Sequence, residues 1–221
     1  MRSYNVVGFI PGTNRRLASE HVVVGAHLDH VGVVQGQIFN GASDNASGIA
    51  VLLEVARLMA AGHASRPVVL VAFGAEEYGL QGSHAFVGSV LDEGFQVVAH
   101  INVDDVGHLR SGTLGRPILA ALHGASMCGE LYSLVKAYGD DSHLTITDSD
   151  DNNLFARSDH YSFYQVGIPV LDFGAGFVST WLHTPEDDPE AMDGDQLQQV
   201  ATVVYQAVRT VAESIGMCKS R

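Results

Sequence analysis

The chain has 221 residues, of which 46% are hydrophobic and 17% charged, a globular composition that excludes a disordered or collagen-like protein. Its 25 acidic and 12 basic residues give a formal net charge of −13, so nucleic acid and anionic membrane surfaces are not expected as partners. No apolar run reaches the roughly 18 residues that span a bilayer, and the first residues do not form the apolar region of a signal peptide.

Short β-branched runs alternate with helical patterns along the chain, which predicts an α/β domain around a mostly parallel sheet. The predicted strands are Asn5–Ile10 at an edge, His21–Ala26, Pro67–Phe73, Val97–Val103, Pro117–Leu122 and Ile168–Phe173. Helices are predicted at Ser47–Ala61 and Gln196–Ala212, where apolar residues recur at helical spacing. The central runs are almost wholly apolar, as is typical of strands covered by helices on both faces. No repeat or linker divides the chain, so residues 1–221 are expected to form one domain.

Metal-binding residue types follow the four central strands. The carboxyl ends of parallel strands meet at one edge of a sheet, and ligands of open α/β sheets bind there. The residues concerned are His27 and Asp29 after the first strand, Glu76 and Glu77 after the second, Asp104 after the third, His183 a loop beyond the fourth, and Asp44 before the first helix. We therefore expect these side chains to gather at one edge of the sheet.

Each of these residues also has a purely structural interpretation. Asp44 is placed to cap the following helix, and His27 with Asp29 resembles an ordinary surface pair. Glu76 and Glu77 could be solvated acids. However, two adjacent carboxylates after a buried strand repel each other unless a cation or another partner offsets the repulsion. Taken together, the pattern favours metal ligands.

The mixture of imidazoles and carboxylates, without a thiolate, indicates zinc, with manganese or cobalt as possible substitutes. Two histidines and three carboxylates exceed the three protein ligands that one catalytic zinc usually takes, so two ions per chain are expected. His27 and Asp29 point to the same side of an extended chain, so we expect the Asp29 carboxylate to accept a hydrogen bond from the imidazole. Of Glu76 and Glu77, one is expected to bind metal and the other to act as general base toward water.

The segments that carry these residues resemble the motifs of the family-28 zinc metallopeptidases, which include bacterial aminopeptidases, glutamate carboxypeptidases and the related glutaminyl cyclases. GAHLDH, NGASDNASG, AFGAEEYGLQGS, INVDDVG, SDHYSFYQVGIPV and HTPEDD occur in the order of that family, from about Tyr4 to about Ala212. The resemblance implies a three-layer α/β sandwich with a mixed, mostly parallel central sheet. It also implies a di-zinc exopeptidase, first of all an aminopeptidase, whose substrates are peptides.

Carried over by position, the resemblance assigns His27 and Asp104 to one zinc, Glu77 and His183 to the other, and Asp44 to both as a bridge. Glu76 is then the general base, and a metal-bound hydroxide attacks the terminal peptide bond. Arg157, Ser158, Asp159 and His160 fall where the family builds its substrate-facing wall, and Asp159 and His160 are expected to contact substrate, although Ser158 or Asp159 could equally cap a helix. The chain has 11 histidines, and the eight besides His27, His160 and His183 are expected to be structural or solvated.

Two alternative functions stay open at this point. A glutaminyl cyclase would share the fold but use a single zinc, and a non-catalytic domain would share the fold without the chemistry. The substrate side chain, the oligomeric state and the choice between amino- and carboxypeptidase are not determined by the motifs. The cellular compartment is not determined either, although members of the family are commonly secreted or periplasmic.

The chain departs from the family pattern in several places. Leu28 and Asp105 stand where many members have an aromatic and an apolar residue, and Asp105 adds a charge near the expected metals. The first strands come without the usual N-terminal helical segment or a protease-associated domain, so we expect a minimal member or a fragment. Cys128 and Cys218 have no metal-type spacing and are expected to be two buried thiols.

Overall fold

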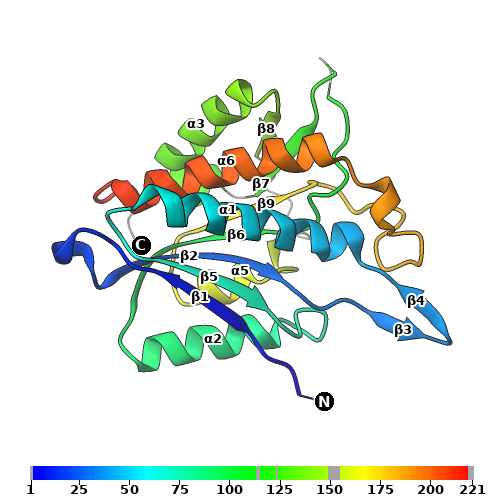
Figure 1. Cartoon of the computed structure of the whole chain (residues 1–221), viewed down its shortest axis with the longest axis horizontal. Helices are drawn as coiled ribbons and strands as arrows, with labels where there is room; N and C mark the ends of the chain where they lie inside the picture. Colours follow the sequence, from blue (N-terminus) through cyan, green and yellow to red (C-terminus); the bar gives the residue numbers. More distant parts are fainter. Residues whose placement is uncertain (1, 113–114, 123, 149–154, 219–221) are drawn as a thin grey trace.

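A computed structural model describes residues 2–112, 115–122, 124–148 and 155–218, and the structural statements below refer to these ranges. Its strands are β1 (Val6–Ile10), β2 (Glu20–His27), β3 (Gly32–Val34), β4 (Gln37–Phe39), β5 (Val68–Phe73), β6 (Gln96–Val103), β7 (Ile118–Leu122), β8 (Thr145–Thr147) and β9 (Val170–Gly174). Seven of them form one sheet in the order β1-β5-β2-β6-β9-β7-β8 (Figure 1).

The centre of this sheet is parallel, and its margins are mixed. Strands β5, β2, β6 and β9 run parallel to one another. Strand β1 pairs antiparallel with β5 at the edge, and β7 pairs antiparallel with β9. The mixed, mostly parallel sheet and its first edge strand are therefore confirmed. The parallel centre directs the ends of β2, β5 and β6 to the same side, which is where the site forms.

Helices cover both faces of the sheet (Figure 1). One face carries α1 (Gly48–Gly62), α3 (Gly124–Asp141) and α6 (Gly194–Glu213), and the other carries α2 (Gln81–Asp92) and α5 (His160–Tyr164). On the first face, α6 buries Val200, Val204 and Val208, which are one turn apart, against α1 and the sheet. On the second face, Phe86 and Phe163 pack against Phe73 of β5. The three-layer α/β sandwich is thus confirmed.

One segment of the chain is long and apolar enough to span a bilayer, although no uninterrupted apolar run of that length was found in the sequence. Residues 42–62 are long and apolar enough to cross a bilayer by length and composition, with a mean hydropathy of 1.2. In the structure the same segment contains the turn of Asp44 and the helix α1, whose Val51 and Val55 are buried in the core. Only 39% of the apolar window is buried, so one side of α1 packs against the sheet and α6 while the other side is open.

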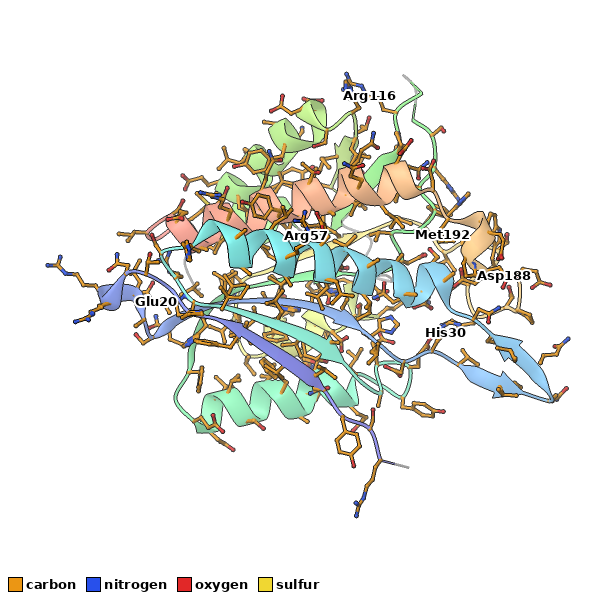
Figure 2. The ribbon with its side chains drawn as sticks, viewed as in Figure 1. Glu20, His30, Arg57, Arg116, Asp188 and Met192 are labelled. Carbon is orange, nitrogen blue, oxygen red and sulfur yellow. A yellow bond between two sulfur atoms is a disulfide. The ribbon has the colours of Figure 1, made fainter. Side chains whose placement is uncertain are left out.

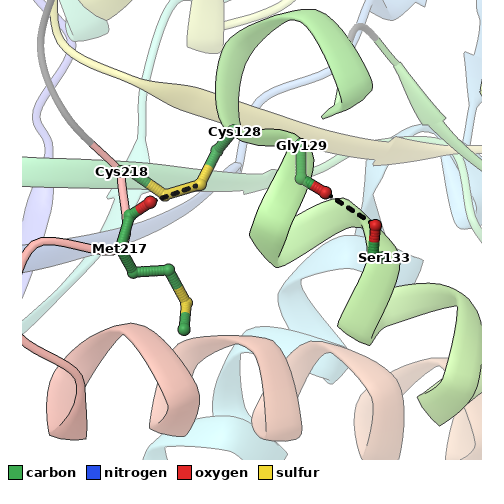
Figure 3. Close-up of a disulfide and its surroundings, with 5 residues drawn as sticks. All are labelled: Cys128, Gly129, Ser133, Met217 and Cys218. Atoms are coloured by element: carbon green, nitrogen blue, oxygen red, sulfur yellow. Dashed lines mark hydrogen bonds between the residues drawn. A yellow bond between two sulfur atoms is a disulfide. The ribbon is translucent and has the colours of Figure 1, made fainter.

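The two cysteines form a disulfide and are not the two separate thiols expected from the sequence (Figure 3). Their Cα atoms are 5.2 Å apart although 90 residues separate them in the chain. Helix α6 packs beside α3, so the tail after α6 passes the first turns of α3 and brings Cys218 to Cys128. This proximity depends on helix packing, which the spacing of two cysteines cannot indicate.

Candidate metal centre

The five expected ligands and Glu76 line one cavity of about 380 Å³ at the carboxyl ends of the parallel strands. His27 is the last residue of β2, Glu76 and Glu77 follow β5, and Asp104 follows β6. Asp44 lies in the turn Ala42–Ser47 that enters α1, and His183 lies in the loop between β9 and α6. Residues from five separate segments therefore meet because parallel strands end on the same side of the sheet.

Asp44 occupies the middle of this cluster. Its Oδ1 atom lies 3.0 Å from Nε2 of His27, and its Oδ2 atom lies 3.1 Å from Nε2 of His183. The same Nε2 atom of His27 lies 3.1 Å from Oδ1 of Asp104. The two oxygens of one carboxylate thus face two different imidazoles.

Glu77 completes the half of the cluster that contains His183. Its Oε2 atom lies 3.0 Å from Nε2 of His183, and its Oε1 atom lies 2.9 Å from Nδ1 of His30. Figure 2 shows His30 at the base of the projecting hairpin β3–β4, close to the loop of Asp188. The structure places His30, which was expected to be structural or solvated, nearly buried beside a candidate ligand. Its position three residues after His27 was the signal available in the sequence.

Asp29 contacts both His27 and the glutamate pair, but in a different way from the one expected. The Nδ1 atom of His27 lies 2.9 Å from the backbone carbonyl oxygen of Asp29, so this carbonyl can accept the imidazole proton. The Asp29 carboxylate instead accepts hydrogen bonds from the backbone N–H groups of Glu76, at 3.0 Å, and Glu77, at 3.3 Å. The side chain turns away from the imidazole because two unpaired N–H groups of the neighbouring turn are within its reach. Asp29 therefore holds the turn that presents Glu76 and Glu77.

In the turn before α1, the side chain that accepts a helix N–H is that of Asn45 and not that of Asp44, so Asp44 is not the helix cap. The side chain of Asn45 accepts the backbone N–H of Gly48, and it donates to the carbonyl of Val103 at the end of β6. The side chain of Asn45, not that of Asp44, therefore accepts the first N–H of α1 and ties this helix to β6, whereas the carboxylate of Asp44 stays in the cavity. Asp105 also joins this turn, since its carboxylate accepts a hydrogen bond from the hydroxyl of Ser43.

Several residues of the site have a left-handed backbone. The φ angle is 59° at Ala75 before Glu76, 52° at Asp105 after Asp104, and 55° at His183 itself. Non-glycine residues rarely adopt positive φ, and each such residue costs on the order of 1–3 kcal/mol unless the surrounding structure holds it. The fold thus maintains strained turns where side chains must converge, as is typical of functional sites.

The electrostatics of the cluster reflect its excess of carboxylates. Burial opposes a charge on His27, yet Asp104 and Asp44 hold the pKa of its imidazole well above the usual range. Asp44 supplies the hydrogen bond that raises the pKa of His183. Burial raises the pKa of the Glu76 carboxyl to about 9, and neighbouring carboxylates add to the increase although His27 opposes it. The shifts at the two histidines indicate a negative potential that favours a cation or a proton at this position, whereas burial is the main cause of the shift at Glu76.

Asp159 and His160 do not line the cavity, which corrects the expectation of substrate contact. Both side chains are fully buried at the start of α5, where His160 lies 3.4 Å from Asp172 through its Nδ1 atom. The helix begins at His160 and turns both residues toward the core. Of the expected wall, Arg157 and Ser158, two residues earlier in the chain, do line the cavity. The apolar wall of the cavity consists of Leu80, Phe177, Val178 and Leu182.

The donor set fits zinc. Its donor atoms are imidazole nitrogens and carboxylate oxygens, which zinc accepts in catalytic sites. They form two groups in which the donor atoms of each lie within 4.8 Å of one another: His30, Asp44, Glu77 and His183, and His27, Glu76 and Asp104. Oε1 of Glu77 and both ring nitrogens of His30 are buried without a hydrogen-bond partner among the described residues, although a close nitrogen–oxygen pair joins them. A metal ion at this position would give these buried atoms a partner.

The α/β sandwich thus gathers imidazoles and carboxylates, the donor groups of a metal centre, at the ends of its parallel strands. The comparisons with known proteins identify the family. The model of peptidase family M28 matches residues 5–208, and the chain belongs to that family.

Similar proteins of known name agree with this assignment. The chain is 31% identical to aminopeptidase YwaD of Bacillus subtilis over 94% of its own length and 45% of the relative. It superposes on the zinc aminopeptidase BSAP from Bacillus subtilis with a TM-score of 0.75 at 28% identity, covering 97% of this chain and 51% of the other. An aminopeptidase from an Aneurinibacillus strain gives a TM-score of 0.75 at 29% identity, covering 98% of this chain and 50% of the other. The chain thus spans about half the length of these relatives.

Proposed function

We propose that this chain carries the catalytic centre of an aminopeptidase that uses two zinc ions to release N-terminal residues from peptides. The observation that carries the proposal is the position of Asp44, whose two carboxylate oxygens lie 3.0 and 3.1 Å from the imidazoles of His27 and His183. A single carboxylate between two ligand groups is the arrangement expected of a bridging ligand in a two-metal site.

The residues around Asp44 divide into two sets of ligands. His27 and Asp104 would hold one zinc, Glu77 and His183 would hold the other, and Asp44 would contact both. When bound, zinc lowers the pKa of water and polarises the substrate carbonyl group. The similar proteins named as zinc aminopeptidases support this choice of metal.

In this proposal Glu76 is the general base and then the general acid of the reaction. Its carboxyl group lines the cavity but is not needed as a ligand, and Asp29 holds its backbone N–H. It takes a proton from the attacking water and delivers that proton to the amine that leaves. Its position in the cavity beside the ligand residues lets it reach a water molecule there, as a general base requires. The apolar wall of the cavity would receive an apolar side chain of the terminal residue.

The first experiment exposes the zinc-loaded protein to a peptide pool in which half of the N-termini are free and half are acetylated. Stepwise release from free N-termini, abolished by a chelator and restored by zinc, is the expected result. Release from C-termini would keep the hydrolytic chemistry and contradict the aminopeptidase. Closure of N-terminal glutamine with loss of ammonia, together with one zinc per chain, would replace the proposal by a glutaminyl cyclase. No reaction at all would favour a non-catalytic domain.

The role of Glu76 is tested separately with Glu76→Gln. We expect metal content to stay at the wild-type value while turnover falls about 10²–10⁴-fold, the usual contribution of general acid–base catalysis. Glu130→Gln, which makes the same change at an exposed position on α3, is the control. Turnover of Glu76→Gln close to that of this control would refute the assignment.

We also propose that the protein works in an oxidising compartment, as the habit of the family suggests. The disulfide between Cys128 and Cys218 supports this, because disulfides persist outside the reducing cytosol. Peptides are the expected partners, and the net charge of −13 does not favour nucleic acid or anionic membranes. Fractionation of producing cells, with a thiol assay of the purified protein, tests the compartment.

A further inference from the structure

Asp187 is a buried carboxylate that has no place in the expected set of ligands. Its side chain is 2% exposed, and it lies four residues after His183 in the loop that precedes α6. Its two oxygens accept hydrogen bonds from consecutive backbone N–H groups of the turn before α1. Oδ1 accepts from Ser43 at 2.8 Å, and Oδ2 accepts from Asp44 at 3.1 Å.

The backbone of Asp187 extends this contact by one residue. Its carbonyl oxygen accepts the N–H of Ala42 at 3.2 Å, so three successive N–H groups, of residues 42–44, all bind Asp187. Buried N–H groups without a partner are costly, so these contacts determine how the turn is held. Because both carboxylate oxygens are used by N–H groups, Asp187 acts on the site through the backbone.

We propose that Asp187 is a positioning residue that sets the bridging geometry of Asp44 and thereby the affinity of the site for metal. This inference rests on the two-metal site proposed above. The side chain of Asp44 is short, so the position of its two oxygens follows the position of its backbone. A shift of the turn would move one oxygen away from His27 and the other away from His183 at the same time.

The loop of Asp187 also carries the candidate ligand His183, so the contact between Asp187 and the turn of Asp44 joins two ligand-bearing segments. His183 is the most exposed of the five candidate ligands, with a side chain 48% accessible and a backbone φ of 55°. The N–H of Asp187 contacts the carbonyl of Thr184 at 3.3 Å, so a short turn links the ligand to the anchor. Asp187 thus connects the more exposed side of the site, the loop of His183, to the buried turn of Asp44.

The experiment measures metal affinity in Asp187→Ala, with Glu186→Gln as the matched control. Glu186 is the neighbouring acid of the same loop and is exposed, so this control changes charge without removing the anchor. Metal-free proteins, shown to be folded by circular dichroism, are titrated with zinc in competition with a chromophoric chelator, and then with cobalt while visible absorption is recorded. We expect Asp187→Ala to bind zinc about 10- to 100-fold more weakly and to give an altered cobalt spectrum, as outer residues of metal sites do when removed.

The outcomes separate this inference from the proposed function. Wild-type affinity and an unchanged cobalt spectrum in folded Asp187→Ala would overturn the positioning role while leaving the proposed function intact. Failure of the wild-type chain to bind zinc would overturn the proposed function, and this inference with it. If the alanine variant does not fold, Asp187→Asn replaces it, since it keeps the volume and one acceptor oxygen. The zinc affinity of Asp187→Asn is expected to lie below those of the wild type and of Glu186→Gln, and a wild-type value would refute the role.

Discussion

The buried imidazole of His100 makes the stability of the protein depend on pH in a calculable way. His100 lies in β6, is fully buried, and stacks on Phe163 with ring centroids 3.8 Å apart. Burial lowers the pKa of this imidazole to about 3, and the neighbouring His160 adds to the decrease, whereas the Val23 backbone and Asn102 oppose it. The native state therefore keeps His100 neutral throughout the weakly acidic range.

At weakly acidic pH the imidazole of His100 is protonated in the unfolded chain and neutral in the native state. An exposed imidazole has a pKa of about 6.5, so below that pH the unfolded state holds one more proton at this position. Stability is then fully present above about pH 6.5, falls as the pH decreases, and stops falling near the native pKa of about 3. The slope is about 1.4 kcal/mol per pH unit, which integrates to about 2 kcal/mol between pH 7 and pH 5.

The assay compares wild-type protein with His100→Gln by urea unfolding at pH 7 and pH 5, in the presence of a chelator. The metal ligands titrate equally in both proteins, so the difference between their losses isolates His100. We expect the wild-type protein to lose about 2 kcal/mol more than the variant over this interval. His84→Gln, at an exposed position of α2, should lose as much as the wild type. Parallel losses in wild type and His100→Gln would refute the reasoning.

Two further predictions follow from other contacts. Replacing Cys128 and Cys218 together by serine should lower the free energy of unfolding by about 2–5 kcal/mol, because the bridge spans 90 residues and restricts the unfolded chain. A reductant should then destabilise the wild type in urea and leave the double variant unchanged, and equal stability of the two oxidised proteins would contradict the bridge. Replacing His30 by glutamine removes the imidazole 2.9 Å from Glu77 and should weaken zinc binding about 10- to 100-fold in a chelator competition. An affinity equal to that of the exposed-site variant His84→Gln would count against a role for His30.

The fold could largely be predicted because its signals are local. The runs that became β2, β5, β6 and β9 are continuous apolar segments, and α1 and α6 carry apolar residues at helical spacing. The family assignment rested on the six motifs that carry the candidate site residues, and it is confirmed by the match over residues 5–208. Helices α2 and α3 and the hairpin β3–β4 were not predicted, since their short or weakly periodic patterns do not stand out in a single sequence.

The gathering of the candidate ligands also followed from the sequence, since each lies directly after a strand or in an adjoining loop, and parallel strands place such ends together. The chain itself therefore determined which side chains meet at the cavity. Tertiary structure decided how they are held. Segments distant in sequence are joined by the disulfide, by the hydrogen bonds of the Asp29 carboxylate to the turn of Glu76, and by those of Asp187 to the turn of Asp44. The burial of Asp159 likewise depends on the packing of its helix in the fold. Such contacts depend on the relative placement of loops and helices, which hydrophobic periodicity and motif spacing do not encode.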